Sequence, residues 1–259
     1  MNKACRLRNH LFSLIFFACL ILFNLLFVSG CGLDTYYVIN PPDTVIHEPI
    51  YSSIDTGSQY FEFYTKEATY NGIRFLGTDV YYKIYGSSSQ METEYRNIIT
   101  TANNAETAVN APSRLIDTYK YKTLETSASF GSQVFIPATG SDRLVKIRLS
   151  DSDATDNPTY AAEVLVDGAL PGGASSTVIP YRNITTVGGA APTFSFARLA
   201  GSSPDLLPKN DDADVNYNSA NGNDFYVCMF AIAVAQDMTY AQLYSNVLYL
   251  GSVKISIVP

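Results

Sequence analysis

The possible folds of this chain are limited most by short segments in which apolar and polar side chains alternate. Residues 79–85 place Val80, Tyr82 and Ile84 on one side of an extended chain and the residues between them on the other. This period of two residues is typical of a β-strand with one face in a core. Further candidate strands lie at residues 60–65, 144–149, 161–166, 177–181 and 248–258. Glycine, asparagine, aspartate, serine and proline residues separate these segments, so the sequence predicts a mainly β fold.

Another segment differs because it is apolar on both faces. Residues 225–235 predict a central strand, since a strand in the middle of a covered sheet is buried from both sides. One inward-facing row is expected to contain Tyr226, Cys228, Phe230 and Ile232. In residues 144–149, by contrast, the alternation predicts that Lys146 and Arg148 point outward.

One stretch has the period of a helix instead. Its apolar face consists of Met91, Tyr95, Ile98, Ile99 and Ala102. Ser89 and Glu92 have the spacing of a capping box, in which the serine caps the helix and the glutamate reaches back to it. We therefore expect an amphipathic helix over about residues 90–102 that lies over the sheet or caps its end.

The N-terminal residues have the pattern of an export signal. Three basic residues precede an 18-residue apolar run from Leu11 to Val28. The run ends in Val28-Ser29-Gly30-Cys31, which resembles the lipobox of bacterial lipoproteins. The resemblance implies that residues 1–30 are removed and that Cys31 carries diacylglycerol and palmitate-type acyl chains, which would anchor the exported protein to the cell membrane or outer membrane. The alternatives are an ordinary cleaved signal and an uncleaved membrane helix, because such a run can span a bilayer.

Removal of residues 1–30 would also set the charge and cysteine content of the mature protein. Three basic residues and no acids leave, so the formal net charge changes from −7 to −10. Such a body gains nothing from a phosphate backbone, which argues against nucleic acid as a partner. Cys5 and Cys19 leave with the signal and Cys31 carries lipid, so Cys228 remains without a partner for an intrachain disulfide. Its place in an apolar strand predicts a packed core thiol rather than a nucleophile.

The strand patterns resemble those of immunoglobulin-like domains. Residues 224–228 resemble the F strand, in which a tyrosine stands two residues before a cysteine. Residues 77–85 are similar to a fibronectin type III C strand, and residues 248–253 would then be the G strand. The chain departs from the pattern in having no tryptophan and in placing 138 residues between Tyr85 and Asp224. The resemblance thus implies an immunoglobulin-like antiparallel β-sandwich with an insertion that includes the amphipathic helix.

The overall layout is also similar to a group of spirochaetal lipoproteins of unknown role. The similarity lies in the lipobox, Tyr60–Phe63, Phe75–Gly86 and Tyr244–Ile255, and it implies no activity. The expected organisation is a signal peptide at 1–30, a lipidated tether at 31–56 with a first strand at 36–40, and a single domain at 57–259 with an insertion around 86–223.

Residues of catalytic type are scarce in the expected mature chain. Its one histidine, His47, lies in the proline-rich tether and is expected to be solvated. No H-E-x-x-H, G-x-S-x-G or phosphate-binding glycine motif is present. The sequence therefore predicts neither a metal site nor a cofactor, and it favours a protein that is not an enzyme.

Acids and tyrosines remain as candidates for function. Asp211, Asp212 and Asp214 form one acidic loop, either a solvated turn or a weak binding site for a neutral or basic partner. A second acidic loop lies at residues 151–156 and is either a solvated turn or a site for a cation such as calcium, although it lacks the glycine and an oxygen ligand of an EF-hand loop. The 19 tyrosines could supply contact surface for a protein or glycan ligand. The favoured function is a lipid-anchored, non-enzymatic binding or structural module, and the alternative is a glycan-acting hydrolase that uses carboxylates alone.

Overall fold

The computed structural model describes most of the chain from residue 38 onward. The described residues are 16, 38–52, 56–69, 71–126, 134–149, 161–171, 176–184, 192–194, 196, 207–216 and 224–256. The chain divides into two compact units, Met1–Val38 and Ile39–Pro259, and almost all described residues belong to the second. Cys31 lies outside the described residues. Within them, no helix is both long enough and apolar enough to cross a membrane.

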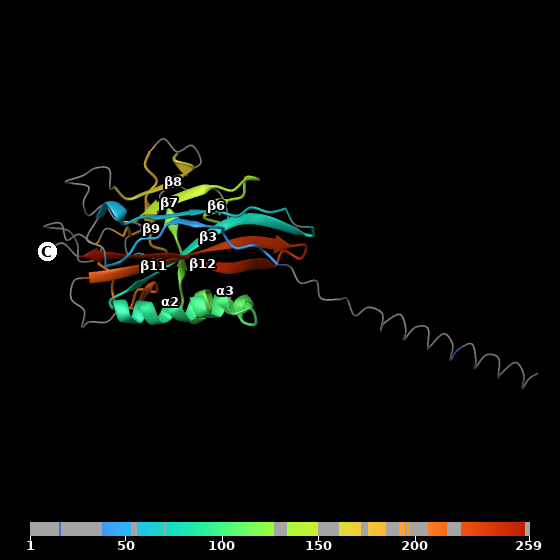
Figure 1. Ribbon diagram of the computed structural model, residues 1–259, viewed down its shortest axis with the longest axis horizontal. Helices are drawn as coiled ribbons and strands as arrows, with labels where there is room; N and C mark the ends of the chain where they lie inside the picture. Colours follow the sequence, from blue (N-terminus) through green and yellow to red (C-terminus); the bar gives the residue numbers. More distant parts are fainter. Residues whose placement is uncertain are drawn as a thin grey trace, which may run out of the picture. The chain divides into compact units, whose positions relative to one another are not determined.

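Two main sheets form the framework of the second unit (Figure 1). The first sheet is antiparallel and has the order β1 (Val45–His47), β2 (Phe61–Tyr64), β7 (Leu144–Arg148) and β8 (Glu163–Val166). The second has the order β10 (Val215–Asn216), β3 (Ile73–Tyr85), β11 (Asp224–Asp237) and β12 (Gln242–Ser256). Strands β4 (Lys122–Thr123) and β6 (Ile136–Pro137) also pair with β3, and β5 (Glu125–Thr126) pairs with β9 (Pro180–Tyr181). The prediction of a mainly β fold is confirmed.

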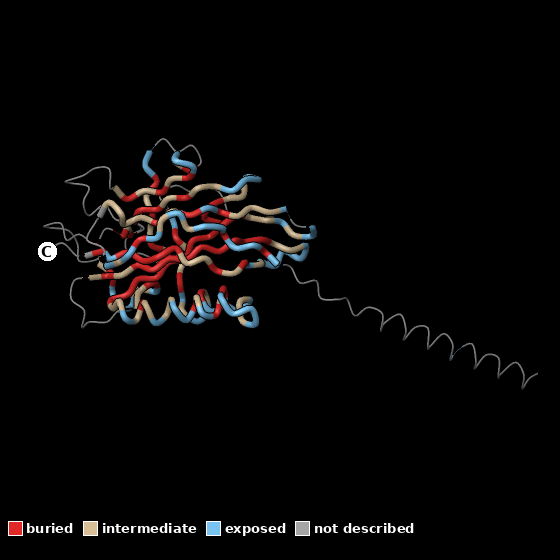
Figure 2. Tube along the Cα trace, in the orientation of Figure 1, coloured by how far each residue is buried: buried red, intermediate tan, exposed pale blue. Residues whose placement is uncertain are grey.

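The main hydrophobic core is formed by buried residues of both sheets. Val80, Tyr82 and Ile84 of β3 are fully buried there, on the face that the alternation predicts. Their neighbours from the other strands include Phe61, Phe63, Val145, Ile147, Val227 and Met229. In Figure 2, buried residues accordingly run along the middle of both sheets.

A helical layer covers the other face of the second sheet (Figure 1). It consists of α2 (Ser88–Asn103), η2 (Ala108–Asn110), α3 (Ala111–Ser113) and the π-type turn η3 (Arg114–Thr118). The short turn η1 (Thr56–Ser58) is not part of this layer and precedes β2. The predicted amphipathic helix is confirmed, because Met91 and Ile98 are fully buried against Phe230 and its neighbours. The outer side of α2 is exposed in Figure 2.

The predicted start of this helix is wrong by two residues. Ser87, not Ser89, is the N-cap, and its side chain accepts a hydrogen bond from the Gln90 N–H at 3.4 Å. Strand β3 ends at Tyr85, so Ser87 is the serine that still has an extended backbone from which to cap the first turn. Glu92 therefore takes no part in a capping box and instead accepts a hydrogen bond from the hydroxyl of Tyr51.

Arg148 is a second correction, because it is buried rather than outward-facing. Only 4% of the residue is exposed, and its guanidinium donates to the Gly57 carbonyl oxygen at 3.0 Å. The turn η1 supplies that carbonyl by folding over this end of β7, which local alternation does not reveal. Lys146 is half-buried and lies 3.9 Å from the Glu163 carboxylate, near the outer side that was predicted.

The first strand is displaced from its predicted position. Of the predicted strand at 36–40, residues 36 and 37 lie outside the described residues, and Val38, Ile39 and Asn40 are not in a strand. Strand β1 begins at Val45, after the two prolines. His47 is therefore part of a sheet and not of a solvated tether. Its Nδ1 lies 2.7 Å from the Tyr60 carbonyl oxygen, and its ring stacks on Tyr60 with the centroids 3.9 Å apart.

The predicted inward row of β11 faces the helical layer, not the other sheet. Cys228, Phe230 and Ile232 are fully buried, as predicted, whereas Tyr226 is only half-buried and meets Tyr51 edge-on. The alternation identifies two buried faces of this strand but cannot say which layer covers each. In addition, the segment that follows the acidic loop of Asp211, Asp212 and Asp214 forms β10, and this short strand pairs in parallel with β3.

Candidate functional site

The three acids that the sequence singles out have very different surroundings. All lie in the described segment 207–216, directly before β10. Asp211 is exposed, the Asp212 side chain is 17% exposed, and Asp214 is fully buried. A binding role for these carboxylates stays a prediction, and Asp211 is the member that a partner could reach without disturbing the interior.

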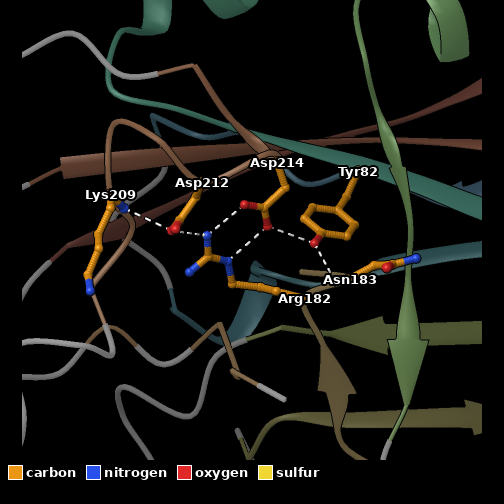
Figure 3. Close-up of polar contacts among 6 residues, drawn as sticks. All are labelled: Tyr82, Arg182, Asn183, Lys209, Asp212 and Asp214. Carbon is orange, nitrogen blue, oxygen red and sulfur yellow. Dashed lines mark hydrogen bonds and ion pairs between the residues drawn. The ribbon is translucent and has the colours of Figure 1, made fainter. Parts of the chain in front are cut away.

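Asp212 and Asp214 converge on one arginine that the sequence analysis missed (Figure 3). The Nε and Nη2 of Arg182 donate to the two oxygens of Asp214 at 2.9 and 2.6 Å. The same Nη2 donates to Asp212 at 2.6 Å. The Tyr82 hydroxyl donates to Asp214 at 2.7 Å and accepts from the Asn183 N–H at 2.7 Å. The result is a forked ion pair with a continuous hydrogen-bonded chain beside it.

Burial and charge act in opposite directions on this arginine. Burial by itself lowers the pKa of Arg182, whose side chain is 1% exposed. The hydrogen bonds and negative charge of Asp214 and Asp212 outweigh that effect and hold the pKa above its ordinary value. Burial, followed by the charge of Asp214, raises the pKa of Tyr82. Tyr82 therefore stays protonated and remains a hydrogen-bond donor.

This arrangement suits a structural clamp better than a reactive centre. Both oxygens of Asp214 accept hydrogen bonds, and no surface of the residue is open to a substrate. The contacts join strand β3, the residue that follows β9 and the segment that precedes β10. The backbone adds to the same junction, since the Ile84 N–H donates to the Asp214 carbonyl oxygen at 2.9 Å. Nothing in the sequence around Arg182, which follows the two-residue strand β9, indicates that it is buried. The one indication is indirect, because buried carboxylates such as Asp214 need a positively charged partner.

A second polar cluster lies between the second sheet and α2. Lys83 Nζ is 2.8 Å from Glu94 and donates to the Tyr119 carbonyl oxygen at 2.6 Å. Glu94 also accepts from the Tyr85 hydroxyl at 2.8 Å and from the Asn216 amide at 2.9 Å. The lysine and glutamate side chains are only 10% and 13% exposed. These bonds connect α2 to β3 and β10, and within the cluster the charge of Lys83 is paired with that of Glu94.

Cys228 lies beneath this cluster and is chemically quiet. It is completely buried, and burial raises the pKa of its thiol to about 12. The hydroxyl of Tyr121 is its hydrogen-bonding neighbour. A thiol with this pKa is not ionised near neutral pH, so the prediction of a packed core thiol is confirmed.

Asp79 is the described carboxyl group most altered by its surroundings. It is 8% exposed, and burial raises its pKa from 3.8 to about 6, while one hydrogen bond from the Phe135 N–H at 2.8 Å opposes the change. Gly77 makes this contact possible: a Cβ there would fall 2.1 Å from the Ile136 carbonyl oxygen, so only glycine allows β6 to approach β3. Tyr81 and Tyr244 lie close enough to Asp79 for its negative charge to add to the effect of burial in raising their pKa values.

Among the described residues, no group of three or more His, Cys, Asp or Glu side chains is placed to hold a metal ion. The acidic loop at 151–156 lies outside the described residues. In comparisons with known proteins, no family model, no curated protein and no solved structure matches this chain.

Proposed function

We propose that this chain is an exported, lipid-anchored envelope protein that acts by binding a protein or glycan rather than by catalysis. The observation that carries the proposal is Val28-Ser29-Gly30-Cys31 at the end of an 18-residue apolar run. This sequence puts a cysteine directly behind two small residues, at the point where an exported chain can receive a lipid. Several acyl chains, at about 0.8 kcal/mol per buried CH₂, would hold the protein durably on a membrane.

The interior of the second unit supports a binding role. Two pairs of its deeply placed charges bind each other, Arg182 with Asp214 and Lys83 with Glu94. The Cys228 thiol is held neutral by burial. Groups that could otherwise act on a substrate therefore stabilise the fold, and contact through exposed loops remains as the mode of action.

An immunoglobulin-like arrangement is part of the same proposal. The neighbour order β3, β11, β12 is that of the C, F and G strands of such domains. The first sheet differs. Of its strands that follow the helical layer, the earlier one, β7, pairs with β2, and the later one, β8, lies outside β7. Immunoglobulin domains place these two strands in the opposite order. The proposal is thus a variant of that sandwich with the two strands exchanged.

Acylation is the first experiment. Cells that process bacterial lipoproteins are grown with labelled palmitate, and the full chain is compared with Cys31→Ala and with the matched leader variant Cys19→Ala. We expect label in the natural chain and in Cys19→Ala but none in Cys31→Ala. An unlabelled natural chain, or label that persists in Cys31→Ala, would refute the lipid anchor.

Turnover is tested separately on the purified chain. The binding proposal predicts no steady hydrolysis across a panel of glycans and peptides. Hydrolysis that disappears when a single carboxylate is replaced by its amide would overturn the binding role in favour of a carboxylate-only hydrolase.

A further inference from the structure

The turn between β11 and β12 presents two large apolar side chains to solvent. Met238 and Tyr240 are 82% and 79% exposed, and Tyr244 in the adjoining strand is 38% exposed. Asp237 is paired with Ile73, so the start of β3 lies beside this turn at the same end of the sheet (Figure 1). An open hollow of about 250 Å³ lies there, lined by Gly72, Ile73, Arg74, Asp237 and Met238. We refer to this turn and the start of β3 as the hairpin tip.

The hairpin tip holds a defined shape through its own polar groups. One oxygen of Asp237 accepts from the Thr239 N–H at 2.8 Å, the Thr239 hydroxyl at 2.7 Å and the Ala241 N–H at 2.9 Å. The Gln236 amide donates to the Tyr240 carbonyl oxygen at 2.9 Å. The polar groups of the turn are thus satisfied internally, while the apolar side chains of Met238 and Tyr240 project away from the body.

The second unit begins beside this tip. Ile39, its first residue, is buried with Ala233 and Ala235 of β11, and Ile73 packs against the same cluster. Ile73 also lines the hollow next to Met238. The chain therefore enters the body at the hairpin-tip end of the sheet.

Covalent geometry keeps this end close to the proposed anchor. Ile39 is eight residues along the chain from Cys31, so the two lie within roughly 29 Å of each other even if the chain between them is fully extended. The opposite end of β11, at Asp224, is eleven residues from Ala235, or about 36 Å along the strand. The hairpin tip is thus the end of the sheet that a lipid on Cys31 would hold nearest the membrane.

The hairpin tip has no net formal charge, whereas the expected mature chain as a whole is strongly negative. The expected mature chain carries a formal charge of −10, which opposes contact with anionic lipid. At the tip, Arg74 is the only charged residue between 71 and 75, and Asp237 is the only one between 236 and 244. Their charges cancel, so electrostatic repulsion does not prevent the tip from approaching a membrane.

We infer that the hairpin tip rests in the lipid–water interface, with Met238 and Tyr240 inserted among the headgroups. Tyrosine is favoured at this depth because its ring is apolar and its hydroxyl stays hydrated. The contact orients the body with the tip towards the membrane and the Asp224 end away from it. The inference rests on the proposed acylation of Cys31, without which the tip has no tether to the bilayer.

The chain contains no tryptophan, so one introduced indole reports on its own position. The full chain is made with Tyr240→Trp, and a matched protein carries Ile50→Trp. Ile50 is also exposed, at 63%, but it lies away from the hairpin tip. The carbonyl oxygen of the preceding Pro49 accepts a hydrogen bond from the Ser252 N–H, and Ser252 is ten residues along β12 from the start of that strand at Gln242. Both proteins are purified in acylated form, checked by mass spectrometry and inserted into vesicles of neutral phosphatidylcholine with or without brominated acyl chains.

The expected result is a blue-shifted emission for Tyr240→Trp, a loss of intensity with brominated lipid and protection from iodide, with none of these for Ile50→Trp. Acylated protein that stays on the vesicles without quenching of the indole at 240 would overturn the tip contact and leave the anchor intact. A blue shift without quenching by brominated lipid would also overturn it, because protein, not lipid, would then cover the tip. Quenching of both indoles would overturn the specific orientation. Absence of acylation would refute the anchor and the tip contact together.

Discussion

Asp79 provides the most direct test of how this fold manages buried charge. Its carboxyl lies on β3 opposite Ile232 of β11 and receives one hydrogen bond, from the Phe135 N–H. Burial raises the pKa from 3.8 to about 6, because removal from solvent disfavours the charged form of the carboxyl. The informative perturbation is Asp79→Asn, which keeps an oxygen for the Phe135 N–H and removes the ionisation.

The magnitude follows from linkage between ionisation and folding. The rise of the pKa from 3.8 to about 6 corresponds to about 3 kcal/mol, because a tenfold change in an ionisation equilibrium is about 1.4 kcal/mol. Below pH 3.8 the carboxyl is neutral in both the folded and the unfolded chain, so the free energy of unfolding includes no penalty from this group. As the pH rises from 3.8 to about 6, the unfolded chain ionises while the folded one resists. Stability is lost across this window, and the loss is complete above it.

The assay is urea unfolding of the natural chain and Asp79→Asn at a series of pH values from 4 to 7.5, with the exposed Asp211→Asn as control. We expect Asp79→Asn to be the more stable protein at pH 7.5, by up to about 3 kcal/mol, and the difference to shrink towards zero near pH 4. Asp211→Asn should follow the natural chain throughout. A difference for Asp79→Asn that does not change with pH, or that grows towards acid pH, would refute the reasoning.

Three further substitutions test the clamp, the core and the helix start by chemical unfolding. Asp214→Asn should lower the free energy of unfolding by about 3–5 kcal/mol, because it removes the negative charge that pairs with the buried Arg182. Asp211→Asn should change it by no more than about 0.5 kcal/mol. Equal effects of the two substitutions would show that the clamp does not stabilise the fold. Phe230→Ala should cost about 3–5 kcal/mol, since Phe230 is fully buried between Tyr121 and Tyr249; a loss below about 1 kcal/mol would contradict its central place. Ser87→Ala should cost about 1 kcal/mol and Ser89→Ala less, whereas the reverse order would restore the capping box.

The sequence determined those features in which local pattern and burial coincide. The alternation at 79–85 correctly assigned Val80, Tyr82 and Ile84 to one buried face, and the helical period identified the face of α2 that carries Met91 and Ile98. These predictions succeed because the spacing of apolar residues depends only on the period of the backbone. Residues 225–235, which are apolar on both faces, likewise predicted a central strand, and β11 does lie between β3 and β12 in the second sheet.

The tertiary structure decided what lies against each of those faces. Nothing near Arg148 or Arg182 in the sequence indicates that either is buried, because the groups that satisfy them come from distant segments. Tyr82 and Asp214, which share the clamp, are 132 residues apart. A local pattern shows which side chains along a strand or helix are buried. The partner of a buried charge, in contrast, comes from a distant part of the chain and is placed only by the complete fold. For this reason, the clamp around Arg182 is visible only in the tertiary structure.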